Sequence, residues 1–382
     1  MAYPSVDKLQ QTLASDVFSY AADTKKAAGR ALGTLVEIMT YYTIRAWDMR
    51  DHIVIERALP EFGNPQITHN VEFSLHPIVG KEQKQIASCA LPITVAKIKS
   101  EIGLLSGFDA EHLNRSNQLL TSRDTRRNSC VLAENGSGMV VANIDAHSDE
   151  RVEFTACKLH PQPFAVFECK RVGVEEGMKK GPQTIEKAKQ GAYVARAVSS
   201  LQKLRSRSGE AIGYIESSDG TIVSGPLTET IKTIIDSHDG GLLCNFILTV
   251  GVVSNHGNWF TSENQNKELR VLAQSYDWLL FLTDAGLAQF IDELLLHPVE
   301  ELAAARKAFL SSYGTGQSGS NRFTKVQMDN SADAALQYYF KSHAQEVEGW
   351  YNVISPHSGT VKKLRDELAV LGAKNWKQIH GL

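Results

Sequence analysis

The segment FAVFECKRVGV places an acid and a base two residues apart, Glu168 and Lys170, within an otherwise apolar run. Alternate side chains of a β-strand lie on the same face, so these two charged groups are expected side by side. In this arrangement a carboxylate can bind a divalent metal ion and a lysine can position water, which are two requirements of phosphodiester hydrolysis. The structural alternative is an ion pair on a solvated sheet surface, with no role in catalysis.

A second carboxylate would complete such a site, and the sequence offers several candidates, of which Asp149 and Glu150 are weaker than Asp145. Glu153 lies 15 residues before Glu168. A hairpin between their strands would put the two acids opposite each other, so we expect Glu153 to be the first metal-binding carboxylate. Asp145 is the alternative, although a turn-capping role is favoured for it. Glu72, in THNVEFSLHP, could supply an additional ligand, but we favour a surface or structural role.

This region, roughly residues 130 to 295, resembles the PD-(D/E)xK nuclease superfamily and, within it, the type II restriction endonucleases. The resemblance depends on strand-turn-strand-helix order around Glu168 and Lys170, and it does not cover the termini. It implies that Mg²⁺ binds to the first acid and to Glu168, while Lys170 orients or activates the attacking water. The sequence departs from the family pattern at the first acid, because no aspartate after a proline is clear there.

The resemblance implies Mg²⁺-dependent, sequence-specific hydrolysis of double-stranded DNA, by a homodimer that cuts both strands of a symmetric site. The absence of GxxxxGK[ST] argues against a nucleotide cofactor. A repair or resolvase-type nuclease of the same fold is one alternative. A catalytically inert DNA-binding module is another, although intact Glu168 and Lys170 count against it.

The formal net charge of -3 gives no global attraction to nucleic acid, but a local basic segment follows the motif. Lysine and arginine clearly outnumber acids between residues 170 and 207, where part of the run is expected to be a solvated helix face. The residues expected to contact DNA phosphates are Lys179, Lys180, Lys187, Lys189, Arg126 and Arg127.

The pattern of apolar residues predicts an α/β fold, with a mixed central β-sheet flanked by helices and further helical segments at both termini. Short β-prone runs between turn residues predict an antiparallel meander from about residue 129, and strands alternate with helices after Pro182. We divide the chain into a mostly helical region (1–120, for recognition or dimerisation), a nuclease core (121–310), and a linker with a helical C-terminal subdomain (311–382).

The composition also excludes several classes of protein. With 382 residues, 42% of them hydrophobic, the chain can bury a core without disulfides, and its five cysteines form no CxxC pair. The sequence has no apolar run long enough to span a membrane and no signal-peptide pattern, so we expect a cytoplasmic protein. GTGQSG at residues 314–319 follows a helical run, which predicts a flexible loop instead of a dinucleotide site.

Overall fold

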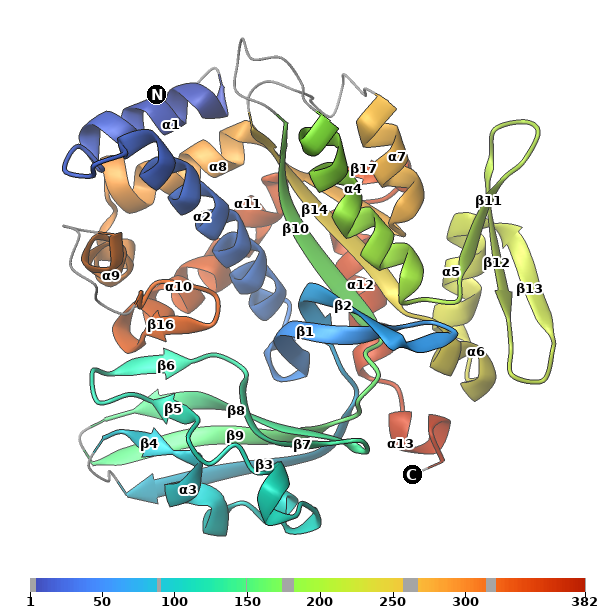
Figure 1. Ribbon diagram of the computed structural model, residues 1–382, viewed down its shortest axis with the longest axis horizontal. Helices are drawn as coiled ribbons and strands as arrows, with labels where there is room; N and C mark the ends of the chain where they lie inside the picture. Colours follow the sequence, from blue (N-terminus) through green and yellow to red (C-terminus); the bar gives the residue numbers. More distant parts are fainter. Residues whose placement is uncertain are drawn as a thin grey trace.

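Three apolar runs of the sequence become neighbouring strands in the computed structural model, which describes residues 5–87, 91–148, 150–173, 182–256, 267–313 and 321–381. They are β10 (Ala165–Gly173), β14 (Leu248–His256) and β15 (Trp278–Leu282), and they run parallel to one another. Antiparallel strands complete the sheet on both sides, in the order β1-β2-β10-β14-β15-β17 (Figure 1). These outer strands are β1 (Ile53–Glu61), β2 (Asn64–Leu75) and β17 (Tyr351–Ser355). The expected α/β class with a mixed central sheet is confirmed.

Helices cover both faces of this sheet, because the side chains of its strands alternate between two apolar clusters. Phe167 and Cys169 of β10 pack in the larger cluster, together with α2, α8 and α10. Val172 packs on the opposite face with α4 and α7. The helices are α1 (Val6–Asp16), α2 (Thr24–Ala46), α3 (Val95–Ile98), α4 (Pro182–Ala197), α5 (Leu227–Asp236), α6 (Gly240–Asn245), α7 (Lys267–Ser275), α8 (Asp284–Ile291), α9 (Ala303–Tyr313), α10 (Asn330–Ser342), α11 (Ala344–Gly349), α12 (Val361–Gly372) and α13 (Trp376–Ile379).

A β-rich region is inserted in the chain between β2 and β10, and it lies below the central sheet in Figure 1. It contains the four-stranded sheet β3-β9-β8-β7 and three strands of a second sheet, β16-β6-β5-β4, whose edge strand β16 comes from the C-terminal part of the chain. The expected meander is confirmed for β7, β8 and β9, which pair in sequence. The strands of these two sheets are β3 (Ile78–Ala87), β4 (Ile93–Thr94), β5 (Gln118–Leu120), β6 (Thr125–Arg127), β7 (Cys130–Asn135), β8 (Gly138–His147), β9 (Arg151–Leu159) and β16 (Gln327–Asp329).

The hairpin expected between β9 and β10 is wrong. Both edges of β9 are taken by β3 and β8, while both edges of β10 are taken by β2 and β14. A further three-stranded sheet, β11-β12-β13, follows α4 and packs against α5. Its strands are β11 (Gln202–Arg205), β12 (Ala211–Glu216) and β13 (Ile222–Pro226).

The terminal regions contribute directly to the core. The N-terminal region is helical to Ala46, and then the β-branched run that begins at Ile53 starts the strands β1, β2 and β3 instead of the expected helical segment. At the other end, β17 is an edge strand of the central sheet. In α10, Asp333 is fully buried and forms ion pairs with Arg45 of α2 at 2.5 Å and with Arg126 of β6 at 2.9 Å. The expected GTGQSG loop lies outside the described residues.

No helix in the described ranges is both long and apolar enough to cross a membrane.

Candidate active site at the fork of two strands

The two strands β2 and β10 separate beside the acid of the predicted motif. They pair antiparallel from Leu75 and Ala165 as far as Phe73 and Phe167, and the pairing stops there. Beyond this point the N–H of Glu72 donates to Oε2 of Glu168 at 3.1 Å. A side-chain carboxylate therefore satisfies a backbone donor that would otherwise lose its partner in the sheet. We call this place the fork.

The predicted contact between Glu168 and Lys170 is confirmed, with Nζ of the lysine 2.8 Å from Oε1 of the glutamate. The Glu168 side chain is only 9% exposed, whereas that of Lys170 is 36% exposed. The acid of the pair is therefore buried, and the lysine is in contact with solvent. Burial raises the pKa of Glu168, and the positive charge of Lys170 opposes that rise. The pair is therefore more enclosed than the exposed ion pair that served as the structural alternative.

Helix α4 packs closely over Glu168, since glycine occupies the position of contact. A Cβ atom at Gly191 would lie 2.7 Å from Cγ of Glu168, which is closer than real Cβ atoms approach other atoms. In the strand beside Glu168, Gly251 makes room in the same way for the ring of Tyr276. These glycines allow α4 and Tyr276 to shield the carboxylate, which explains its raised pKa.

A pocket of about 580 Å³ opens beside the pair, between α4 and the outer half of β2. His69 stands on the β2 side, where its Nε2 lies 3.2 Å from a carboxylate oxygen of Glu61. Tyr193 stands on the α4 side and meets His69 edge to face, with 5.2 Å between ring centroids. The residues that line the pocket are Thr68, His69, Asn70, Glu168, Lys170, Lys189, Gln190, Tyr193 and Val194.

A buried lysine gathers three further carboxylates at the fork. The Lys325 side chain is 7% exposed, and its Nζ lies 3.1 Å from Glu37 of α2 and 3.0 Å from Glu56 of β1. It also forms an ion pair with Glu72. Three carboxylates around one ammonium give this Lys325 cluster a formal charge of -2. Glu72 belongs both to the cluster, through its side chain, and to the fork, through its N–H.

The backbone around Glu56 and Glu72 is irregular. Glu56 has φ of 54°, in the left-handed region that residues other than glycine seldom adopt. The β1–β2 ladder has no pairing between Glu56 and Glu72, although its register is the same on both sides, with Ile55 opposite Phe73 and Arg57 opposite Val71. Such strain is typical of positions where a side chain must be re-aimed, and here it accompanies the gathering of acids around Lys325.

The structure does not bring the two predicted first acids to the fork. Glu153 lies on β9 opposite Gln85 and Ala146 and pairs with Arg151 at 3.1 Å. Asp145 lies on β8 and forms an ion pair with Arg50 at 2.6 Å. Both acids lie in the β3-β9-β8-β7 sheet, whereas β10 belongs to the central sheet. The strands β9 and β10 therefore follow each other in sequence but lie in different sheets.

Glu72, for which a surface or structural role was favoured, is the acid whose backbone lies at the fork and whose side chain pairs with Lys325. It follows a valine and precedes a phenylalanine, as Glu153 does, so the local letters do not distinguish the two acids. The apolar run VEFSL was a signal for a strand at this place, although a local pattern does not reveal which strand it pairs with.

The predicted DNA-binding residues differ in their exposure and contacts. Lys189 is exposed on α4 and lines the pocket, whereas Arg127 is half-buried on β6. The prediction for Arg126 is wrong, since its side chain is 9% exposed and is held by Asp333 and by the carbonyl oxygen of Ile144. Lys179 and Lys180 lie outside the described residues, and Lys187 lies within α4, where only the backbone is described.

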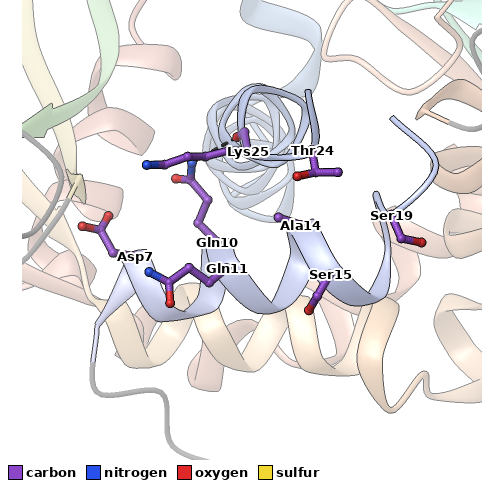
Figure 2. A pocket seen from close by; sticks show the side chains of 8 residues that line it. All are labelled: Asp7, Gln10, Gln11, Ala14, Ser15, Ser19, Thr24 and Lys25. Atoms are coloured by element: carbon purple, nitrogen blue, oxygen red, sulfur yellow. Dashed lines mark hydrogen bonds between the residues drawn. The ribbon is translucent and has the colours of Figure 1, made fainter. Parts of the chain in front are cut away.

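A second pocket, of about 570 Å³, lies between α1 and the start of α2 (Figure 2). Gln10 crosses its floor and donates from Nε2 to the carbonyl oxygen of Lys25 at 3.2 Å. Of the described residues that line this pocket, Asp7 is the one acid. The pocket beside Glu168 also has one acid among its lining residues, but there the acid forms an ion pair with a lysine, Lys170.

One group of three possible metal ligands occurs among the described residues, and it lies in the β-rich region. The ligand atoms of Asp109, Glu111 and His112 lie within 4.8 Å of one another, and both acids are exposed. Exposed acidic groups of this kind are common without a metal ion.

The sequence matches no protein-family model, and it has no match among the curated proteins or solved structures with which it was compared. A functional proposal must therefore depend on the fork, the pocket and their chemistry.

Proposed function

We propose that this protein is a Mg²⁺-dependent nuclease of the PD-(D/E)xK type, and specifically a type II restriction endonuclease that hydrolyses double-stranded DNA. The observation that carries the proposal is the Glu168–Lys170 pair at a fork where a second acid, Glu72, is hydrogen-bonded through its N–H to Glu168. In this proposal Glu72 takes the place that the sequence had assigned to Glu153 or Asp145.

The chemistry of the donors at the fork suits a magnesium ion. Mg²⁺ prefers hard oxygen ligands, and it commonly takes one or two carboxylates together with water and substrate phosphate. Glu168 and Glu72 are the carboxylates that would hold it. Glu72 is itself one of the three acids of the Lys325 cluster, whose formal charge of -2 favours a further cation at this end of the sheet. When bound, the metal ion would shield the phosphate charge and make a coordinated water more acidic.

Lys170 has the position required of the water-orienting group. Its ammonium is fixed at 2.8 Å by the buried carboxylate of Glu168, yet the side chain remains partly open to the pocket. During hydrolysis a water molecule loses one proton to solvent as its oxygen attacks phosphorus, the bond to the leaving sugar oxygen breaks, and that oxygen takes up a proton from solvent. Lys170 would donate a hydrogen bond to the attacking water or to a phosphate oxygen, where negative charge develops.

The surroundings of the pair also support this assignment. Helix α4 and Tyr276 restrict water around Glu168, and charge–charge interactions become stronger in such a site. Lys189 lines the same pocket and supplies a second positive group on the side where a phosphate would enter. A homodimer would place two such sites on the two strands of a symmetric sequence.

The test is digestion of a mixed-sequence plasmid with Mg²⁺, followed by sequencing of the fragment ends. Discrete fragments with a common end sequence would support a restriction endonuclease. A smear would support a nuclease of the same type without sequence specificity. Intact plasmid in both Mg²⁺ and Mn²⁺, with retained binding in a gel-shift assay, would contradict the enzymatic proposal and favour an inert DNA-binding module. Light scattering of the eluted protein tests the homodimer.

A further inference from the structure

We infer that the pocket beside Glu168 holds one nucleotide with its base stacked on Tyr193, a role that rests on the proposed nuclease function. The Tyr193 side chain is 59% exposed, although it lines a pocket next to a buried acid. A large exposed aromatic side chain within a pocket is suited to cover a ligand, because its rigid ring contributes contact area at small entropic cost. Aromatic rings on which bases stack are a general device of proteins that bind single-stranded nucleic acid.

The ring of Tyr193 is held in place by its neighbours while most of it stays uncovered. His69 meets it edge to face at 72°, and Glu61 in turn holds His69 through its Nε2 at 3.2 Å. Aromatic pairs favour this edge-to-face geometry. The contact therefore orients the tyrosine ring in advance and lowers the entropy that a stacked base would otherwise have to overcome.

The other groups of the pocket match the parts of a nucleotide. Lys189 and Tyr193 are four residues apart on α4 and thus share one face of the helix, so a cation and a ring stand together. The exposed side chains of Thr68, Asn70 and Gln190 can donate to or accept from the edge of a base. The volume of about 580 Å³ falls within the range of roughly 300–1,000 Å³ that small-molecule pockets occupy.

The position of the pocket determines which nucleotide it would take. Glu168 and Lys170 line the same pocket, so a base on Tyr193 would belong to a nucleotide adjoining the reacting phosphate. A base inside a duplex is covered on both faces by its neighbours, and it must leave the stack before a protein ring can replace one of them. The ligand is therefore a nucleotide with an unstacked base, which comes either from a single strand or from a duplex that extrudes it.

The test measures binding of the full-length protein in Ca²⁺ to a fluorescein-labelled oligothymidine and to an abasic oligonucleotide of the same length. Tyr193→Ala should weaken binding to oligothymidine by about 5- to 150-fold, which corresponds to the loss of one base–ring stack, and should leave binding to the abasic strand unchanged. Tyr193→Phe should behave as wild type, because the ring is retained. Tyr338→Ala is the matched control, since Tyr338 is a tyrosine of α10 that is 60% exposed.

A second arm distinguishes the source of the base. Duplexes that carry 2-aminopurine beside the cleavage site should become brighter on binding if the base is extruded, and this rise should be lost in Tyr193→Ala. If the 2-aminopurine fluorescence does not rise, but Tyr193→Ala still weakens binding to oligothymidine, the pocket binds a base of single-stranded DNA.

Equal affinity of wild type and Tyr193→Ala for oligothymidine would overturn the inference, as would equal losses on both oligonucleotides. This failure can be told apart from a failure of the proposed function. If Glu168→Ala abolishes Mg²⁺-dependent cleavage while Tyr193→Ala binds normally, the nuclease stands and the stacking role falls. If wild type never cleaves DNA but the base-dependent loss in Tyr193→Ala is found, the nucleotide pocket stands without the nuclease.

Discussion

The N–H of Glu72 donates to the carboxylate of Glu168 across the point where β2 and β10 stop pairing. The two strands would otherwise leave a backbone donor without a partner at this place, and the carboxylate supplies one. The same carboxylate accepts from Lys170 through its other oxygen. One acid therefore fixes the position of a second acid, through its backbone, and of a lysine, through its side chain.

A second acid-x-lysine pair in the chain shows why the letters alone do not define the site. Glu82 and Lys84 are also two apart on a strand, β3, and Nζ of the lysine lies 3.3 Å from the carboxylate. Here the acid is 24% exposed, and it also accepts a hydrogen bond from the N–H of Gly103, at the start of a short 3₁₀ helix (Gly103–Gly107). The Glu168 pair differs in its burial and in its place at the fork.

This likeness allows a matched test of catalysis. Glu168→Gln and Lys170→Ala should each lower Mg²⁺-dependent plasmid cleavage by at least about 100-fold, since each removes a group placed at the reacting phosphate. Glu82→Gln and Lys84→Ala should leave the rate unchanged. Binding in a gel-shift assay with Ca²⁺ should survive in all four variants. A Glu168→Gln protein that cuts near the wild-type rate would remove the fork from the proposed active site.

The identity of the first acid is decided by three parallel variants. Glu72→Gln should lower the single-turnover cleavage rate at saturating Mg²⁺ by at least about 100-fold, and Glu153→Gln should not, because Glu153 lies in another sheet. Asp145→Asn should keep the rate as well, although the loss of its pair with Arg50 can lower stability. Activity in Glu72→Gln together with inactivity in Asp145→Asn would show that the structural reassignment is mistaken.

Local patterns in the sequence predicted the parts of this site that depend on a single strand. The apolar runs gave β10, β14 and β15, and the two-residue period put Glu168 and Lys170 on one face. The partner of β10 could not be obtained in the same way. Nearness in sequence favours a hairpin with β9, whereas the true neighbour β2 ends at Leu75, before the whole inserted region.

Charge in a sequence likewise does not reveal long-range partners. Arg126 was assigned to DNA because it follows Arg123 and precedes Arg127 in a basic stretch. Its guanidinium instead bonds to Asp333, 207 residues further along the chain. The side chain is thereby buried between the β-rich region and α10, and such an ion pair is invisible until the fold is known.

The same ion pair should make stability depend on pH. Burial alone would raise the pKa of Asp333, but the guanidinium groups of Arg45 and Arg126 outweigh that effect and hold the pKa below its ordinary value of 3.8. A lowered pKa in the folded state means that the ionised aspartate stabilises the protein above this ordinary value. This contribution is lost as the pH falls through the lower pKa of the folded state.

Asp333→Asn should therefore reduce the free energy of unfolding near neutral pH, by about 3–5 kcal/mol if both arginines are left without a counter-charge. The difference from wild type should shrink as the pH falls below about 3.8, where this aspartate is protonated in the unfolded chain, and should be lost once the folded protein is protonated as well. Urea titrations from pH 7 to acid conditions measure both effects. Asp366→Asn, at a surface pair that is 53% exposed, serves as the control and should change stability by less than about 1 kcal/mol. A difference that grows on acidification would contradict the proposed role of the charge.

The last prediction concerns the basic face of α4. Lys189 is exposed, lines the pocket and is expected to contact a DNA phosphate, so Lys189→Ala should weaken binding to cognate and noncognate DNA alike. Each lost phosphate contact should reduce the slope of log K against log [salt] by about one unit, because fewer counterions are released. Lys362→Ala is the control, since this lysine is 68% exposed on α12 and pairs with Asp366. Fluorescence anisotropy at several salt concentrations in Ca²⁺ gives both slopes. An unchanged slope in Lys189→Ala would assign this face of α4 to solvent and require a different DNA-binding surface.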